Sequence, residues 1–182
     1  MRTFLLLAAA LIAAASLGVS GEHSGRRAPG FSLPDMSDAK WRRHDLQDYR
    51  GKIVVIDVMK TDCPHCGVTA ATLESIKAKY KDRVVVLAVV HPQDKPDQVQ
   101  DFIKRHKVSY PVLFDCGQMA ASYFGITPDR SQVPIHVPHL FIIDSRGVIA
   151  EDYGYSAINR EIFEGKGLVP VLDRLLAATG RK

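Results

Sequence analysis

The chain has 182 residues, of which 46% are hydrophobic and 24% are charged, and its formal net charge is +4 at pH 7. These proportions are ordinary for a globular protein, and they exclude a disordered chain, a collagen-like chain and a polytopic membrane protein. The basic residues are scattered along the chain, so nucleic-acid binding, which needs a concentrated basic face, is not expected. Three cysteines are too few for a disulfide scaffold.

The N-terminus has the layout of a secretory signal peptide. Arg2 precedes an unbroken apolar run from Phe4 to Ala15, and small residues follow. A membrane-spanning helix needs about 20 apolar residues, and this run is shorter. Residues 1–20 are therefore predicted to be a signal peptide that directs the chain to the periplasm or outside the cell. An uncleaved membrane anchor is the alternative. Residues 21–30 are predicted to be a flexible lead-in.

Residues 31–182 are predicted to form one α/β domain. The turn-rich residues 31–46 suggest a hairpin with Trp41 as its main anchor, and residues 53–58 are a β-branched strand buried on both faces. Residues 64–80 are predicted to be a helix, and residues 83–90 a second buried strand parallel to the first. The remaining predicted elements are a helix over 97–106, a strand over 112–114, a helix over 119–124, a hairpin over 140–150 and a closing helix over 168–178.

The sequence Cys63-Pro64-His65-Cys66 carries most of the chemical information. Cys63 falls at the start of the predicted helix, where free N–H groups and the helix dipole favour a thiolate. His65 can add positive charge beside that thiolate. A structural zinc site usually needs further ligands at short spacing, and only Cys116 remains. The motif is therefore interpreted as a redox dithiol.

Four segments match a known family in order: Phe31-Ser32-Leu33-Pro34, Gly51-Lys52-Ile53-Val54-Val55, Cys63-Pro64-His65-Cys66 and Pro138-His139-Leu140-Phe141-Ile142-Ile143-Asp144. On these segments, residues 31–178 resemble the thioredoxin-like superfamily. Within it, they resemble the exported TlpA/ResA-type group, which overlaps the redoxin/AhpC-TSA family. The resemblance implies a thioredoxin-like α/β fold, with a central mixed β-sheet flanked by helices. An N-terminal extension and a strand and helix inserted before a cis-proline are implied as well.

The resemblance also assigns roles to residues. It implies that Cys63 is the exposed attacking sulfur, that Cys66 is the buried resolving sulfur, and that Asp57 shuttles a proton for Cys66. Pro138 matches the cis-proline of the family, so the backbone of Val137 would face the dithiol and pair with a substrate strand. These residues, with Pro64 and His65 as tuning positions, are the predicted site.

Three positions keep alternative interpretations. An Asp57 surrounded by Ile and Val should have its pKa raised by desolvation, although an Asp paired or solvated at a strand end is the alternative. Pro134 competes with Pro138 as the cis-proline. Cys116 is predicted to be a buried, inert thiol; a third redox thiol or an intermolecular bridge is the alternative.

The predicted function is extracytoplasmic thiol–disulfide exchange with protein substrates. It is placed on the oxidising side because Pro64-His65 is the dipeptide of the strongly oxidising DsbA-type proteins. We expect no cofactor beyond the Cys63–Cys66 disulfide, no metal and no nucleic acid. We expect a membrane or periplasmic redox partner and a monomeric state. One alternative is a Sco-like copper-binding metallochaperone that uses the cysteine pair and His136 or His139. Another is a thiol reductant for cytochrome c maturation.

Overall fold

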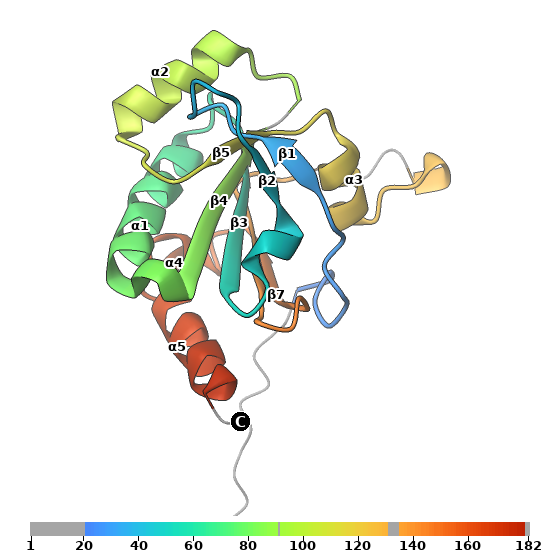
Figure 1. Cartoon of the computed structure of the whole chain (residues 1–182), viewed down its shortest axis with the longest axis vertical. Helices are drawn as coiled ribbons and strands as arrows, with labels where there is room; N and C mark the ends of the chain where they lie inside the picture. Colours follow the sequence, from blue (N-terminus) through green and yellow to red (C-terminus); the bar gives the residue numbers. More distant parts are fainter. Residues whose placement is uncertain (1–20, 91, 131–134, 181–182) are drawn as a thin grey trace, which may run out of the picture.

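A computed structural model of the chain describes residues 21–90, 92–130 and 135–180. The predicted signal peptide, residues 1–20, and Pro134 lie outside the described residues. One central sheet has its strands in the order β5-β4-β3-β6-β7, and Figure 1 shows helices packed around it. The strands are Ile53–Met59 (β3), Val84–Val90 (β4), Val112–Phe114 (β5), His139–Ile143 (β6) and Ile149–Gly154 (β7).

The sheet is mixed, which confirms the predicted fold class. β3 and β4 are parallel neighbours, and β5 continues the parallel set beside β4. β6 pairs antiparallel with β3, and β7 pairs antiparallel with β6, so the predicted second hairpin is present. β5 and the helix after it lie between β4 and the cis-proline in chain order, where the inserted strand and helix are predicted.

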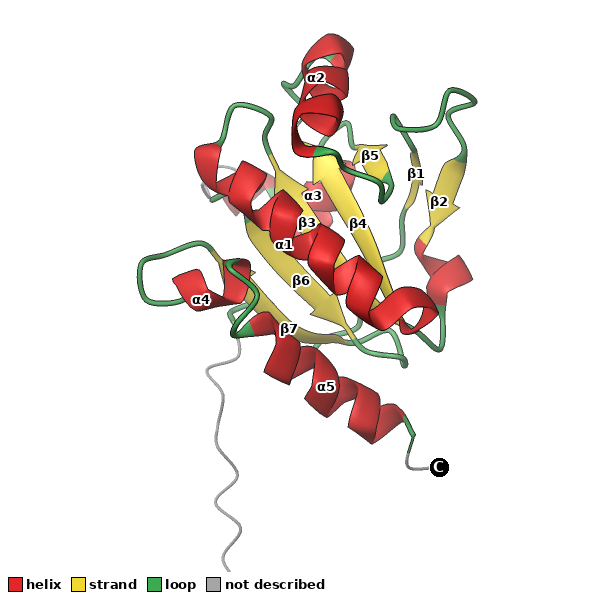
Figure 2. Cartoon of the chain, turned by 90° about the vertical axis from the view of Figure 1, so that its left-hand side faces the viewer, coloured by secondary structure: helices red, strands yellow, loops and turns green. Residues whose placement is uncertain are grey.

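The helices are Pro64–Tyr80 (α1), Pro96–His106 (α2), Gln118–Phe124 (α3), Arg160–Phe163 (α4) and Leu168–Thr179 (α5), with 3-10 turns at Leu46–Tyr49, Lys81–Arg83 and Pro128–Arg130. In Figure 2, α1 and α5 lie across the near face of the sheet and α3 lies behind it. The short α4 was not predicted, because four residues are too few for a periodic pattern to show. Within the described part of the chain, no helix has the length and hydrophobicity to cross a bilayer.

The alternation of side chains along β3 divides the core into two layers. Ile53, Val55 and Met59 point to the face covered by α1, α2, α4 and α5. Val54, Ile56 and Val58 point to the face covered by α3 and by the N-terminal part of the domain. Because both faces are covered, every residue of β3 is buried, Asp57 included, as its β-branched run predicts.

The predicted first hairpin is present, but its predicted anchor is not. Ser32–Pro34 (β1) pairs antiparallel with Arg43–Asp45 (β2). Trp41 is 50% exposed and has a φ of 51°, in a turn where its N–H donates to the Asp38 carbonyl. The prediction for Trp41 was wrong because the turn directs this side chain away from both core layers. Phe31 and Leu46 anchor the segment instead.

Residues 21–30, predicted to be a flexible lead-in, are hydrogen-bonded to β7 and to the turn before it. The N–H of Gly25 donates to the Ile149 carbonyl at 2.8 Å, and the N–H of Ala28 donates to the Gly147 carbonyl at 2.9 Å. These bonds add the segment to the sheet edge next to β7, which would otherwise expose unpaired backbone groups.

The side chain of Asp152 on β7 provides a second attachment for the same segment. Its Oδ1 accepts hydrogen bonds from the His23 N–H at 3.0 Å and from the Ser24 hydroxyl at 2.7 Å. Its Oδ2 lies 3.2 Å from Nε2 of His139, at the start of β6. Burial alone would raise the pKa of Asp152, but the hydrogen bonds from His139 and Ser24 outweigh it and lower the pKa.

The substitution Asp152→Ala is expected to lower the free energy of unfolding at pH 7 by about 1–3 kcal/mol, because buried donors lose their acceptor. Since the folded protein lowers the pKa of Asp152, its contribution is present above the ordinary carboxyl range and is lost as the pH falls below about 4. Urea unfolding at pH 7 and pH 3 measures both effects. Asp152→Asn, which keeps an acceptor oxygen, is the control and should retain part of the stability. Equal stability of Asp152→Ala and the parent at pH 7 would contradict this account.

Candidate functional site

Cys63 lies between the end of β3 and the start of α1. It is the N-cap residue of α1, and Pro64 occupies the first helical position, where the missing N–H costs no hydrogen bond. Sγ of Cys63 accepts a hydrogen bond from the Cys66 N–H at 3.2 Å. The sulfur thus accepts a hydrogen bond from a free N–H at the positive end of the helix dipole. This arrangement stabilises a thiolate. Cys63 is half-buried and Cys66 is fully buried, and both are free thiols.

The segment before β6 forms the other side of the site. The Val137–Pro138 peptide bond is cis, which is the geometry that the resemblance implies for Pro138. The carbonyl oxygen of Val137 lies 3.8 Å from Sγ of Cys63. The strand pairing explains this proximity: Val58 of β3 pairs with His139 of β6, so the chain leaves β3 where it enters β6.

Asp57 is a buried acid on β3, the strand that precedes the two cysteines. Asp57 lies on the same face of β3 as Val55 and Met59, because it is two residues from each. Its side chain therefore points to the layer that contains Cys66. The side chain is completely buried, and neither carboxyl oxygen has a hydrogen-bond partner among the described residues. Burial raises the pKa of Asp57 to about 8. Burial also raises the pKa of the Cys66 thiol, and the charge of Asp57 raises it further.

His65 is exposed on the first turn of α1 and lies against an aromatic ring that the sequence analysis did not identify. Its imidazole stacks on Tyr155, with the ring centroids 4.0 Å apart and the planes 21° from parallel. A second unpredicted contact is the hydrogen bond from the Thr61 N–H to Oδ2 of Asp94, at 2.9 Å. No sequence motif marks Tyr155 or Asp94, since both come from segments distant in the chain.

Cys116, His136 and His139 lie in different surroundings. Cys116 is exposed in the loop after β5, two strands from β3, so the predicted burial of this thiol is wrong. His136 is exposed, and His139 is buried against Asp152. In the part of the chain that the structure describes, no three His, Cys, Asp or Glu side chains gather as metal ligands.

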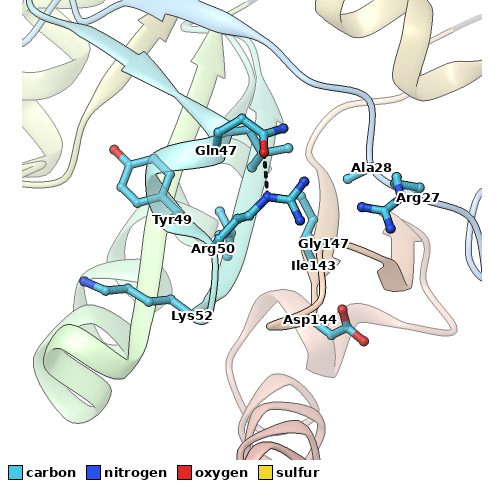
Figure 3. Close-up of a pocket in the computed structure, with 11 residues that line it drawn as sticks. Arg27, Ala28, Gln47, Tyr49, Arg50, Lys52, Ile143, Asp144 and Gly147 are labelled. Carbon is cyan, nitrogen blue, oxygen red and sulfur yellow. Dashed lines mark hydrogen bonds between the residues drawn. The ribbon is translucent and has the colours of Figure 1, made fainter.

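A small pocket lies at the other end of β3. Figure 3 shows Arg27 and Arg50 on opposite sides of it with Lys52 nearby, and its lining includes Val54 and Ile143. Because Val54 is near the beginning of β3 and the cysteine motif follows its end, this pocket is not part of the dithiol site.

Similar chains of known structure place this architecture among thioredoxin-like folds. A secreted thiol-disulfide isomerase from Corynebacterium glutamicum superposes with a TM-score of 0.66 at 17% identity, covering 82% of this chain and 85% of that one. A DsbF homologue from Corynebacterium diphtheriae superposes with a TM-score of 0.64 at 21% identity, covering 83% and 88% of the two chains. At these identities the similarity establishes the fold.

Two curated relatives are similar in sequence. The thioredoxin-like protein YneN of Bacillus subtilis is 29% identical over 133 residues, which cover 72% of this chain and 71% of the relative. The thiol-disulfide oxidoreductase ResA of Bacillus thuringiensis is 25% identical over 128 residues, which cover 70% and 68%. The model of the AhpC/TSA family matches residues 24–152, a span that contains Asp57, both cysteines of the motif and the cis-proline. The chain that brings these residues together therefore belongs to the AhpC/TSA family.

Proposed function

We propose that the protein is an extracytoplasmic thiol–disulfide oxidoreductase that exchanges disulfides with protein substrates through Cys63 and Cys66. The observation that carries the proposal is the position of Cys63, whose sulfur caps α1 and lies 3.8 Å from the carbonyl oxygen of Val137. This sulfur is half-buried rather than enclosed, whereas Cys66 is inaccessible. The name of ResA, a thiol-disulfide oxidoreductase, supports the same activity.

The reaction proceeds in two exchanges. A substrate thiolate attacks Sγ of Cys63 in the oxidised pair, the Cys63–Cys66 bond breaks, and Cys66 leaves with the electron pair and takes a proton. A second substrate thiolate then attacks the substrate sulfur of the mixed disulfide and releases Cys63 as a thiolate. The substrate is oxidised to a disulfide, and the two electrons remain on the cysteine pair. Asp57, buried in the same layer as Cys66, is the proposed proton donor. No further cofactor is required.

The surroundings of Cys63 favour the oxidising direction. Groups that stabilise its thiolate stabilise the reduced pair, and a stable reduced pair makes the disulfide a stronger oxidant. The capping N–H of Cys66 is one such group, and positive charge on the imidazole of His65 would be a second.

The reduction potential of the Cys63–Cys66 pair tests this proposal. Equilibration with glutathione is expected to give a potential above the thioredoxin value of about −270 mV. The substitution His65→Thr should lower it, because the variant lacks the imidazolium. Lys104→Thr, which removes an exposed positive charge on α2, is the control for net charge and should leave the potential unchanged. A parent potential at or below that of thioredoxin would identify a reductant and contradict the proposed direction.

The proposed location rests on the apolar segment at residues 4–15 and on the secreted relative from Corynebacterium glutamicum. Outside the cytoplasm, a disulfide can form and persist. The electron acceptor is then a membrane or extracytoplasmic redox partner. The Sco-like copper carrier finds no support, because ResA and the structural relatives are described as thiol–disulfide proteins.

A further inference from the structure

The ring of Tyr155 is held firmly beside the cysteine motif. Tyr155 follows directly after β7, and its N–H donates a hydrogen bond to the carbonyl of Pro138 at 3.1 Å. Its ring packs on Phe163 of α4 in a T-shaped arrangement, with the centroids 5.3 Å apart and the planes at 68°. Phe163 is 1% exposed, so it is a fixed part of the core. His65 stacks on a face of the Tyr155 ring.

We propose that Tyr155 is a positioning residue for the redox pair, which holds the imidazole of His65 beside Cys63 and thereby raises the oxidising power of the disulfide. This inference rests on the proposed function, and it assigns a role to a residue outside the cysteine motif. The geometry that supports it is the nearly parallel stack of the two rings at 4.0 Å, on a residue tied to the cis-proline segment.

The stack acts on His65 in two ways. His65 is exposed, so without a partner its side chain would sample several rotamers, many of them directed into solvent. The face of an aromatic ring also attracts a cation, and such a contact at an exposed site is favoured about two- to fivefold. Both effects keep positive charge near Cys63, and this charge favours the thiolate and hence the reduced pair.

Tyr155 also connects the two halves of the site. Its side chain contacts α1 through His65, while its backbone bonds the carbonyl of Pro138, the residue next to Val137. A change in the ring therefore tests the effect on His65 separately, because the backbone hydrogen bond does not depend on the side chain.

A double-mutant cycle on the glutathione equilibrium tests the proposal. The substitution Tyr155→Leu, which keeps an apolar contact for Phe163, is expected to shift the equilibrium toward the disulfide form by up to about fivefold. Tyr155→Phe keeps the ring and should match the parent. In a His65→Thr background, Tyr155→Leu should cause no further shift. Urea unfolding of each variant confirms the folded state, and Tyr155→Met replaces Tyr155→Leu if that variant does not fold.

Three results would overturn the role of Tyr155. They are an unchanged equilibrium in Tyr155→Leu, an equal shift with and without His65, and a Tyr155→Phe variant that behaves like Tyr155→Leu. The last two would mean that the side chain acts through the fold or through its hydroxyl. If the parent exchanges no disulfide with glutathione, the proposed function fails as well. If the parent exchanges disulfides with glutathione and Tyr155→Leu has the same equilibrium as the parent, only the role of Tyr155 is overturned.

Discussion

The substitution Cys63→Ser is expected to abolish disulfide exchange, whereas Cys66→Ser is expected to stop the reaction at a mixed disulfide. The reason is the difference in access: Cys63 is half-buried at the start of α1, and Cys66 is 0% exposed beneath it. If Cys63 is removed, the only sulfur left in the pair is that of Cys66, which an incoming thiolate cannot reach. Without Cys66 the mixed disulfide on Cys63 has no internal thiol to resolve it.

Incubation with glutathione disulfide followed by intact-mass measurement distinguishes these outcomes. The Cys66→Ser variant should hold one glutathione on Cys63, and the parent should release it and form the internal disulfide. Cys116 is exposed and would also react, so all proteins are compared in a Cys116→Ser background, which should itself turn over like the parent. Exchange that survives in Cys63→Ser, or an adduct that maps to Cys66 in the parent, would contradict the assignment.

The elements that the sequence predicted well are those whose local signals agree. The predicted helix over 64–80 matches α1 at both ends, because Pro64 fits the first helical position and Tyr80 is the last residue of its apolar stripe. The buried strands were equally clear, since β-branched runs covered on both faces have no other stable arrangement. The motif residues could be located because β3 leads directly into α1.

The features that the sequence did not predict depend on contacts between distant segments. The bond from His23 to Asp152 spans 129 residues, and the stack of His65 on Tyr155 spans 90 residues. No periodicity or spacing encodes such a contact. Cys116 was misjudged for a related reason: it follows a strand of only three residues, and the pattern of so short a strand does not show which side of the loop faces solvent.

The substitution Asp57→Asn is expected to slow disulfide exchange by about 10²–10⁴, the range typical of a lost general acid or base. Because burial raises the pKa of Asp57 to about 8, the carboxyl group is mostly protonated at pH 7 and can donate its proton to Cys66 as that sulfur leaves. The assistance is present below pH 8 and is lost as the pH rises above it. An amide has no such proton to give.

The same substitution should make the protein more stable, which separates a lost proton donor from a damaged fold. The pKa of Asp57 is about 8 in the folded chain and close to 3.9 in the unfolded chain, so the unfolded state gains by ionising between these values. Stability attributable to Asp57 is therefore complete below pH 4 and declines as the pH rises to 8. Removing the titration should raise the free energy of unfolding at pH 7 by up to about 4 kcal/mol.

Stopped-flow exchange with a thiol substrate and urea unfolding at pH 4, 7 and 8.5 measure the two effects on the same preparations. Asp62→Asn is the matched control: it removes an exposed carboxylate next to Cys63, and water screens its charge, so both quantities should stay near the parent values. If Asp57→Asn is more stable but exchanges at the parent rate, Cys66 takes its proton from water. If it is slower but not more stable, the carboxyl group is ionised in the folded protein, and its burial is compensated by water within the core.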